Sequence, residues 1–166
     1  MFKRFYPDRW EDSTYVINFE ELYENGYRGI IFDIDNTLVP HGMDADERSI
    51  ALMERLKKIG FEICLLSNNK QERVERFNRD VNVKYIYDAH KPSRKNYQEA
   101  MKLMGTSINN TVFVGDQLFT DVYGAKRTGL FNILVKPMNP KEEIQIVLKR
   151  YLEKIVLSCY KRSIGG

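Results

Sequence analysis

Short apolar runs alternate along the chain with longer segments of helical periodicity. Five of these runs are rich in branched and aromatic residues and are only five or six residues long, which is typical of β-strands. They read as continuous apolar stretches, as expected for strands whose two faces are both buried. The predicted strands cover residues 29–34, 61–66, 84–88, 111–115 and 132–136.

The segments between the predicted strands have helical signatures. Residues 44–59 place apolar side chains mostly three or four positions apart and are followed by Gly60, a common helix terminator. Further helices are predicted over residues 69–80, 93–104 and 118–128. Strands that alternate with helices form βαβ units, which require a parallel sheet covered by helices on both faces. The predicted fold class is therefore α/β, with a doubly wound parallel sheet of five strands.

Two segments lie outside this predicted core. Residues 1–27 form an N-terminal extension with a basic, aromatic start and a short helix near residues 18–25. Residues 140–162 predict an amphipathic helix, and we expect its apolar stripe to pack on the core. That stripe consists of Ile144, Val147, Leu148, Tyr151, Leu152, Ile155 and Val156. A chain of 166 residues has room for one catalytic domain, so we expect a single domain over residues 1–166.

Composition and charge narrow the class of protein. With 30% charged residues and a formal net charge of +3, the chain is typical of a globular protein, and its charge gives no specific nucleic-acid signal. No apolar stretch approaches the roughly 18 to 20 residues that span a bilayer, and the first residues lack the apolar region of a signal peptide. Cys64 and Cys159 are far apart and are expected to be reduced thiols, the first buried in an apolar run. We expect a cytoplasmic protein.

Polar residues of unusual type follow the predicted strands. In an open α/β sheet, reactive groups collect at the carboxyl ends of the strands. The residues at these ends are, in chain order, Asp33, Asp35, Ser67, Lys91, Asp116 and Asp121. Extended backbone would direct the carboxylates of Asp33 and Asp35 to the same side. With the other two aspartates they predict a cluster of four carboxylates, which requires a divalent cation, and oxygen ligands suit Mg²⁺.

These residue types fit a phosphomonoesterase with a covalent intermediate. A carboxylate can attack phosphorus to give an acyl phosphate that water then cleaves. We assign Asp33 as the nucleophile and Asp35 as the general acid and base. Mg²⁺, Lys91 and the Ser67 hydroxyl would balance the charge on the transferring phosphoryl oxygens.

Four motifs together resemble those of the haloacid dehalogenase (HAD) superfamily of phosphatases. They are DIDNTL at residues 33–38, Ser67 after the second strand, Lys91 before a proline, and GDQLFTD at residues 115–121. All four occur in the family's order, and the resemblance covers about residues 28–136. It implies a Rossmann-like sheet in the strand order 5-4-1-2-3.

The resemblance also implies a metal site and a substrate class. The metal would be held by the Asp33 side chain, the Asp35 backbone carbonyl and Asp116, with Asp121 near the metal's waters. The segments FDIDNTL, LLSNN, KP and GDQLFTD look closer still to the YqeG-type subgroup of HAD class IIIA. Proteins similar to that subgroup include phosphatases that remove the terminal phosphate of phosphatidylglycerophosphate.

Four residues within or next to the motifs are candidates for substrate contact. Asn36 and Asn68 fit substrate contact and loop-shaping hydrogen bonds equally well. Thr37 fits a loop-shaping role better than substrate contact. His41 follows the first motif in a loop beside the site.

The spacing of the motifs also bears on access to the site. Only 28 residues separate Leu38 from Ser67, and 23 separate Ser67 from Lys91, so neither gap has room for a cap domain. We therefore expect a capless, open site that suits a bulky phosphomonoester. Phosphatidylglycerophosphate is the first candidate by resemblance, and a soluble metabolite, a phosphoprotein or a nucleic acid end is the alternative.

Two other readings belong to different classes. A phospho-receiver module also places an aspartate and a lysine at strand ends, but Asp35 would shorten the lifetime of its phospho-aspartate. A binding scaffold is less favoured, because every motif is intact.

Residues 136–166 hold seven Lys and Arg against three Glu. Together with the basic, aromatic start of the chain, this charge suits peripheral contact with the inner face of a membrane.

Overall fold

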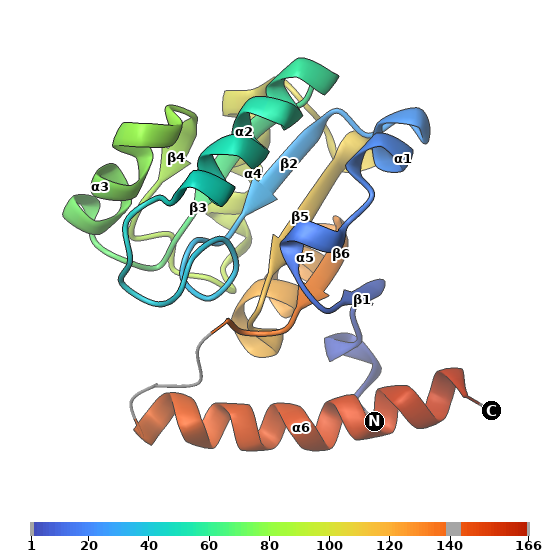
Figure 1. Cartoon of the computed structure of the whole chain (residues 1–166). Coiled ribbons are helices and arrows are strands. Elements are labelled where there is room, and N and C mark those ends of the chain that lie inside the picture. The colour runs from blue at the N-terminus through green and yellow to red at the C-terminus, as the bar shows by residue number, and fades with distance from the viewer. Residues whose placement is uncertain (1, 139–143, 166) are drawn as a thin grey trace.

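A parallel β-sheet forms the centre of the molecule (Figure 1). The computed structural model describes residues 2–138 and 144–165. In these residues the sheet has six strands, in the spatial order β1-β6-β5-β2-β3-β4, and every neighbouring pair is parallel. The strands are β1 (Arg9–Glu11), β2 (Gly29–Phe32), β3 (Glu62–Leu66), β4 (Lys84–Ile86), β5 (Thr111–Gly115) and β6 (Phe131–Val135).

The predicted α/β class with a parallel sheet is confirmed, but the predicted count of five strands was wrong. The additional strand, β1, lies at the edge beside β6 and changes the order of the sheet. It has only three residues, Arg-Trp-Glu, too few for a hydrophobic pattern to show. The other five strands keep the order β6-β5-β2-β3-β4, which brings the carboxyl ends of β2 and β5 together at the centre.

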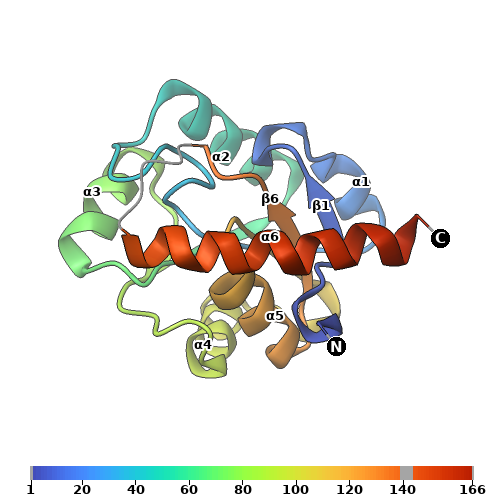
Figure 2. The same ribbon diagram turned by 90° about the horizontal axis from the view of Figure 1, so that it is seen from below.

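Helices cover both faces of the sheet (Figure 2). One face carries α1 (Phe19–Glu24), α2 (Glu47–Ile59) and α3 (Gln71–Val81). The other carries α4 (Arg94–Met104) and α5 (Tyr123–Thr128). The last helix, α6 (Ile144–Ile164), runs past the carboxyl ends of the strands (Figures 1 and 2).

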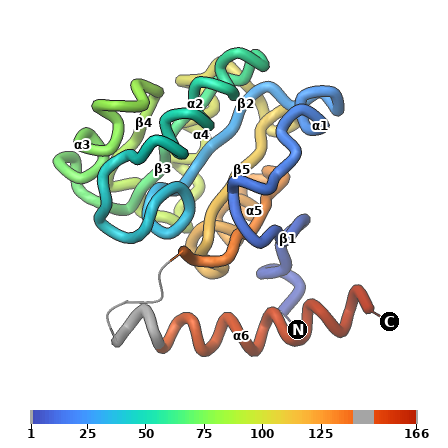
Figure 3. Tube along the Cα trace, viewed as in Figure 1, coloured from blue at the N-terminus to red at the C-terminus, as the bar shows by residue number. Residues whose placement is uncertain are grey.

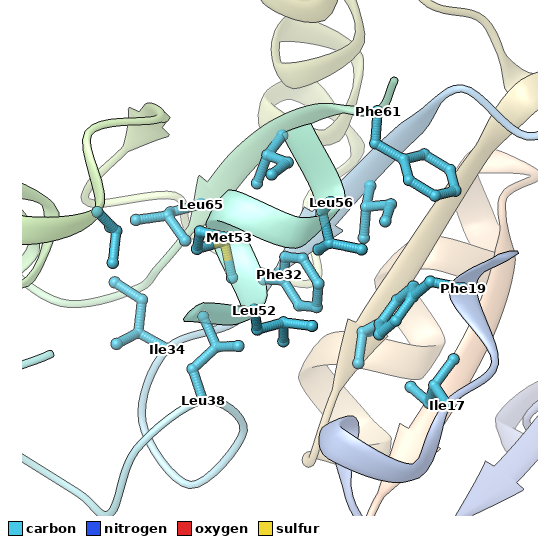
Figure 4. Packing of buried hydrophobic residues seen from close by; sticks show 14 of the residues in the cluster. Ile17, Phe19, Phe32, Ile34, Leu38, Leu52, Met53, Leu56, Phe61 and Leu65 are labelled. Carbon is cyan, nitrogen blue, oxygen red and sulfur yellow. The ribbon is translucent and has the colours of Figure 1, made fainter. Parts of the chain in front are cut away.

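Local sequence explains where α2 lies. Its N-cap Asp46 accepts a hydrogen bond from the Ser49 backbone N–H, and Gly60 ends the helix at φ 119°. The apolar face then packs Leu52, Met53 and Leu56 against the sheet around Phe32 (Figure 4). This packing fixes the strand that leads into the first motif.

The predicted helix over residues 118–128 is divided in two. Leu118–Val122 forms one π-helical turn, and α5 follows it directly. Such turns within helices occur frequently at functional sites. Here the turn carries Asp121 back toward the end of β5.

The apolar stripe of α6 does not pack on the core as we expected. Four of its side chains are exposed: Leu148 by 62%, Tyr151 by 67%, Leu152 by 54% and Ile155 by 45%. Only Val156 is buried, and the side chains of residues 144 and 147 lie outside the described residues. No helix in the described part of the chain combines the length and apolarity needed to cross a bilayer.

The side of α6 that carries Glu153, with Val156 at its edge, packs on the body of the protein. Glu153 and Val156 are buried there. Nearer the C-terminus, the Tyr160 ring lies 5.1 Å from the ring of Tyr6, so the two ends of the chain lie side by side (Figure 3). The prediction failed because polar groups at the carboxyl ends of the strands need partners, and a charged pair on α6 provides them.

Both cysteines of the chain are free thiols. Cys64 is buried in β3, as predicted, and burial raises the pKa of its thiol to about 12.

Candidate active site

The first motif begins where β2 ends. The Asp33 backbone N–H donates to the Val114 carbonyl of β5 at 3.0 Å, so Asp33 continues the strand pairing. The chain then turns, because the N–H groups of Thr37 and Leu38 both donate to the Ile34 carbonyl. Asn36 sits within this turn at φ 61°, a left-handed conformation that asparagine tolerates. The turn separates the side chains that flank Ile34.

Lys91 connects two carboxylates in the interior. Its Nζ lies 2.9 Å from Asp33 Oδ1 and 2.6 Å from Asp121 Oδ1, and the residue is only 7% exposed. Burial by itself would lower the pKa of Lys91, but the two carboxylates outweigh burial and raise it. The lysine is therefore a fixed positive charge beside Asp33.

Three buried carboxylates gather at the ends of β2 and β5. Asp33, Asp116 and Asp121 each bring one oxygen within 4.8 Å of the others. Burial raises the pKa of Asp33 to about 7; Lys91 opposes this shift and neighbouring Asp116 adds to it. Burial also raises the pKa of Asp116 and Asp121. Oxygen ligands with this excess of negative charge fit a hard divalent cation such as Mg²⁺.

The predicted cluster of four carboxylates was wrong, because Asp35 points elsewhere. Its Oδ1 accepts from the Gly42 backbone N–H at 2.7 Å and from Arg73 Nη2 at 2.9 Å. Its Oδ2 accepts from Asn69 Nδ2 at 2.5 Å. The expectation of parallel side chains assumed extended backbone, whereas β2 ends at Phe32 and the turn redirects Asp35 toward α3.

Thr37 lies between two of the clustered carboxylates. Its hydroxyl is 3.2 Å from Asp116 Oδ1 and 3.4 Å from Asp33 Oδ2, and its own carbonyl accepts from the Thr14 hydroxyl. Asp121 Oδ2 accepts from the backbone N–H groups of Asp116 and Gln117, which closes the turn after β5. These contacts hold the carboxylates in place before any ligand binds.

The remaining candidate residues lie around this centre. Ser67 is buried, and its hydroxyl oxygen accepts from the Asn69 backbone N–H at 3.0 Å. Asn68 hydrogen-bonds the backbone N–H and carbonyl of Lys91, which is the loop-shaping role weighed for it. His41 is largely exposed and its Nδ1 is 3.9 Å from Asp35 Oδ1.

Two arginines that contact the site were not identified as site residues in the sequence analysis. Arg73 of α3 contacts Asp35, and Arg150 of α6 contacts Asp116. Arg73 lies in the first turn of the helix that follows Ser67, so its position near a strand end was a usable signal. Arg150 and Glu153 stand one turn apart on a helix that was predicted to be amphipathic, and this spacing was the signal for Arg150.

Comparison with known proteins agrees with this arrangement. Haloacid dehalogenase-like hydrolases match residues 44–129 of the chain. The Bacillus subtilis protein "Probable phosphatase YqeG" is 36% identical over 164 residues, which is 98% of this chain and 95% of that protein. The chain belongs to the haloacid dehalogenase-like hydrolases. Family membership and the phosphatase relative together identify it as a phosphatase.

Other HAD relatives are more distant. "Phosphatidylglycerophosphate phosphatase 1, chloroplastic/mitochondrial" of Arabidopsis thaliana is 26% identical; the match covers 92% of this chain but only 46% of that protein. A solved structure of a putative 3-deoxy-D-manno-octulosonate 8-phosphate phosphatase from Vibrio cholerae superposes with a TM-score of 0.54 at 17% identity, covering 69% of this chain and 68% of that one. The structural likeness shows the shared HAD fold.

Proposed function

We propose that the chain is a Mg²⁺-dependent phosphomonoesterase that works through a phospho-aspartate on Asp33. The observation that carries the proposal is the position of Asp33, which is buried, paired with Lys91 and grouped with Asp116 and Asp121. A cation bound by these carboxylates would offset the charge of the phosphoryl group and the nucleophile. Lys91 supplies a second, permanent positive charge to the same group.

The proposed reaction has two steps. A carboxylate oxygen of Asp33 forms a bond to phosphorus while the bond from phosphorus to the leaving alcohol breaks, and Asp35 gives its proton to the alcohol oxygen. Water then attacks phosphorus while Asp35 takes a proton from that water. The bond between phosphorus and the Asp33 oxygen breaks, which releases phosphate and restores the free carboxylate. Asp35 must turn from its contacts with Gly42, Asn69 and Arg73 toward the substrate for both transfers.

The test measures phosphate release and the covalent intermediate together. Wild type and Asp33→Asn are compared on p-nitrophenyl phosphate with Mg²⁺ and with EDTA, and the intact mass after acid quench reports phosphorylation. We expect Mg²⁺-dependent release and a gain of one phosphoryl group, both lost in the variant. A variant as active as wild type would exclude Asp33 as the nucleophile.

Arg73 supports a substrate whose leaving alcohol carries a negative charge. Its side chain is 11% exposed and gives one N–H to Asp35, while Nε and Nη1 have no hydrogen-bond partner among the described residues. Such buried donors favour an anionic acceptor. Because Asp35 must reach the leaving oxygen, Arg73 lies on the leaving-group side. The phosphodiester of phosphatidylglycerophosphate is an anion of this kind.

A matched pair of soluble substrates tests this preference. Glycerol 3-phosphate and the deacylated head group of phosphatidylglycerophosphate share the reacting phosphate and differ in the added phosphodiester. We expect wild type to favour the head group in kcat/KM, and Arg73→Gln to lose that preference, while Arg79→Gln, an exposed arginine further along α3, keeps it. Equal use of both substrates by wild type would favour the alternative, a phosphatase of a soluble metabolite, phosphoprotein or nucleic acid end.

The outer face of α6 supports peripheral contact with an anionic membrane. Its exposed apolar residues lie beside exposed Lys149, Lys154 and Arg162, a combination that suits a bilayer surface. We expect wild type to sediment with anionic vesicles at low salt, and Leu148→Ser with Leu152→Ser to sediment much less. Leu103→Ser, an exposed leucine on α4, is the control. Absence of wild-type binding would remove the membrane from the proposal.

The capless architecture belongs to the same proposal. Between β2 and β3 the described chain contains a single helix, α2, which packs on the sheet. An open site fits a phosphate presented on a lipid surface.

A further inference from the structure

The C-terminal helix reaches the proposed metal site through Arg150. This helix follows the last strand and lies outside residues 44–129, the part matched by the HAD family. It nevertheless crosses the carboxyl ends of the strands, where the carboxylates gather (Figures 1 and 2). Its charged inner face therefore meets the segment that follows β5.

Arg150 makes a forked contact with one residue of the cluster. Its Nη1 donates to the Asp116 carbonyl at 2.7 Å, and its Nη2 donates to Asp116 Oδ2 at 2.5 Å. The Asp116 side chain is fully buried and that of Arg150 is 15% exposed. A planar guanidinium that holds a carboxylate and its own backbone carbonyl fixes the orientation of that side chain.

Glu153 fixes the arginine in turn. Its Oε2 accepts from Arg150 Nη1 at 3.1 Å, and its Oε1 accepts from the Leu118 backbone N–H at 3.0 Å. The pair thus clamps the chain from Asp116 to Leu118 from one turn of α6. Glu153 is itself buried, so the contact is not a mobile surface ion pair.

The two oxygens of Asp116 face different partners. Oδ1 is next to the Thr37 hydroxyl, which also approaches Asp33, so it lies on the side of the carboxylate cluster. Oδ2 is held by Arg150 on the side of α6. A cation bound among the carboxylates can use Oδ1 while Arg150 keeps Oδ2.

We propose that Arg150 is a positioning residue of the metal site, which orients Asp116 from the C-terminal helix. Like other groups that orient a metal ligand from behind, it should change metal affinity when removed, typically by about 10- to 100-fold. This inference rests on the proposed function only in assuming a divalent cation at Asp116. It adds a residue outside the HAD motifs to the working site.

The sign of the effect separates positioning from simple charge. Loss of a positive charge near a cation site strengthens cation binding, whereas loss of the group that orients a ligand weakens it. Arg150→Gln therefore gives opposite results under the two explanations. Arg150→Lys keeps the charge but not the fork, and should weaken binding as well.

The experiment measures Mn²⁺ and Mg²⁺ binding to the full chain by calorimetry, without substrate. Arg150→Gln should raise the dissociation constant by about 10- to 100-fold. Lys154→Gln, an exposed residue one turn further along α6, should stay within about twofold. Limited proteolysis, with thermal unfolding, shows whether α6 remains docked in each variant.

Each result is decisive. Unchanged or tighter metal binding by Arg150→Gln would overturn the proposal, whether or not α6 stays docked. If metal binding weakens in Arg150→Gln while α6 is released or the variant unfolds, Arg150→Lys decides by the same measurement. No metal binding by wild type would refute the proposed metal site itself, and with it this inference, whereas metal binding without phosphatase activity would leave Arg150 as a positioning residue and refute only the reaction.

Discussion

Removal of the buried lysine should destabilise the metal-free protein strongly. Lys91 is 7% exposed and pairs with Asp33 at 2.9 Å and Asp121 at 2.6 Å. Lys91→Met keeps the length of the side chain but leaves two buried carboxylates without a counter-charge. Breaking a buried pair by removing one partner costs about 3–5 kcal/mol. For a domain of this size each kcal/mol lowers Tm by about 2–4 °C, so we expect a loss of about 6–20 °C.

The loss of stability caused by Lys91→Met should increase with pH. Burial already raises the pKa of Asp33 to about 7, above its ordinary value of 3.8, and Lys91 opposes that shift. Without Lys91 the pKa rises further, so the folded variant binds a proton more tightly than the unfolded chain. The stability gained from that proton is present at low pH and is lost as pH rises through the folded pKa. The deficit of Lys91→Met should therefore be larger at pH 8 than at pH 5.5.

Calorimetric unfolding in EDTA at these two pH values provides the measurement. Lys70→Met is a matched control, since Lys70 also pairs with an aspartate at 2.9 Å, but its side chain is 84% exposed. An exposed pair contributes at most about 1 kcal/mol, so the control should lose less than about 4 °C. The reasoning would be refuted if Lys91→Met had the same Tm as the control. It would also be refuted if the difference in Tm between wild type and Lys91→Met became smaller as pH rises.

Three further predictions test the site and its support. Because protons compete for Asp33 below its pKa of about 7, the dissociation constant for Mg²⁺ should rise by up to about tenfold per pH unit below pH 7 in calorimetry, and a constant value would exclude Asp33 as a ligand. Asp35→Asn should lower turnover of glycerol 3-phosphate by about 10²–10⁴-fold in steady-state assays, and wild-type turnover would remove Asp35 from proton transfer. Gly124→Ala would press a methyl group into the Tyr97 hydroxyl, so it should cost about 1–3 kcal/mol in urea unfolding. Ser158→Ala on exposed α6 surface is its control, and equal stability of the two variants would show that α4 and α5 separate freely.

The sequence predicted that the candidate residues meet at one edge of the sheet, because that depends on fold class, and the resemblance to the HAD superfamily implied the order of the strands. Once the strands are known to alternate with helices, residues that follow β2 and β5 must lie at one edge of the sheet. Asp33 and Asp116 were found in this way, and the structure places them together with Asp121. Side-chain identity and position in the chain were sufficient here.

The direction of Asp35 was not predictable in the same way. Its side chain is turned by a tight loop, which depends on where β2 stops and on the left-handed Asn36. Strand ends are the least certain part of a hydrophobic pattern, and one residue of difference reverses the side to which a side chain points. Asp35 also contacts Arg73, which comes from α3, an element far from the first motif in the sequence.

The case of α6 shows why an apolar stripe does not identify the buried face. Hydrophobic periodicity predicts that one face will be covered. Covering that face stabilises the folded state by about 25 cal/mol for each Å² of apolar surface removed from water. At the end of the sheet, however, the Leu118 N–H and the Asp116 carboxylate are buried and require partners, and an unpaired buried charge costs several kcal/mol. Arg150 and Glu153 meet that requirement, so the charged face turns inward and the apolar face remains outside. The same helix thereby joins the carboxylate cluster to the surface that we propose for membrane contact.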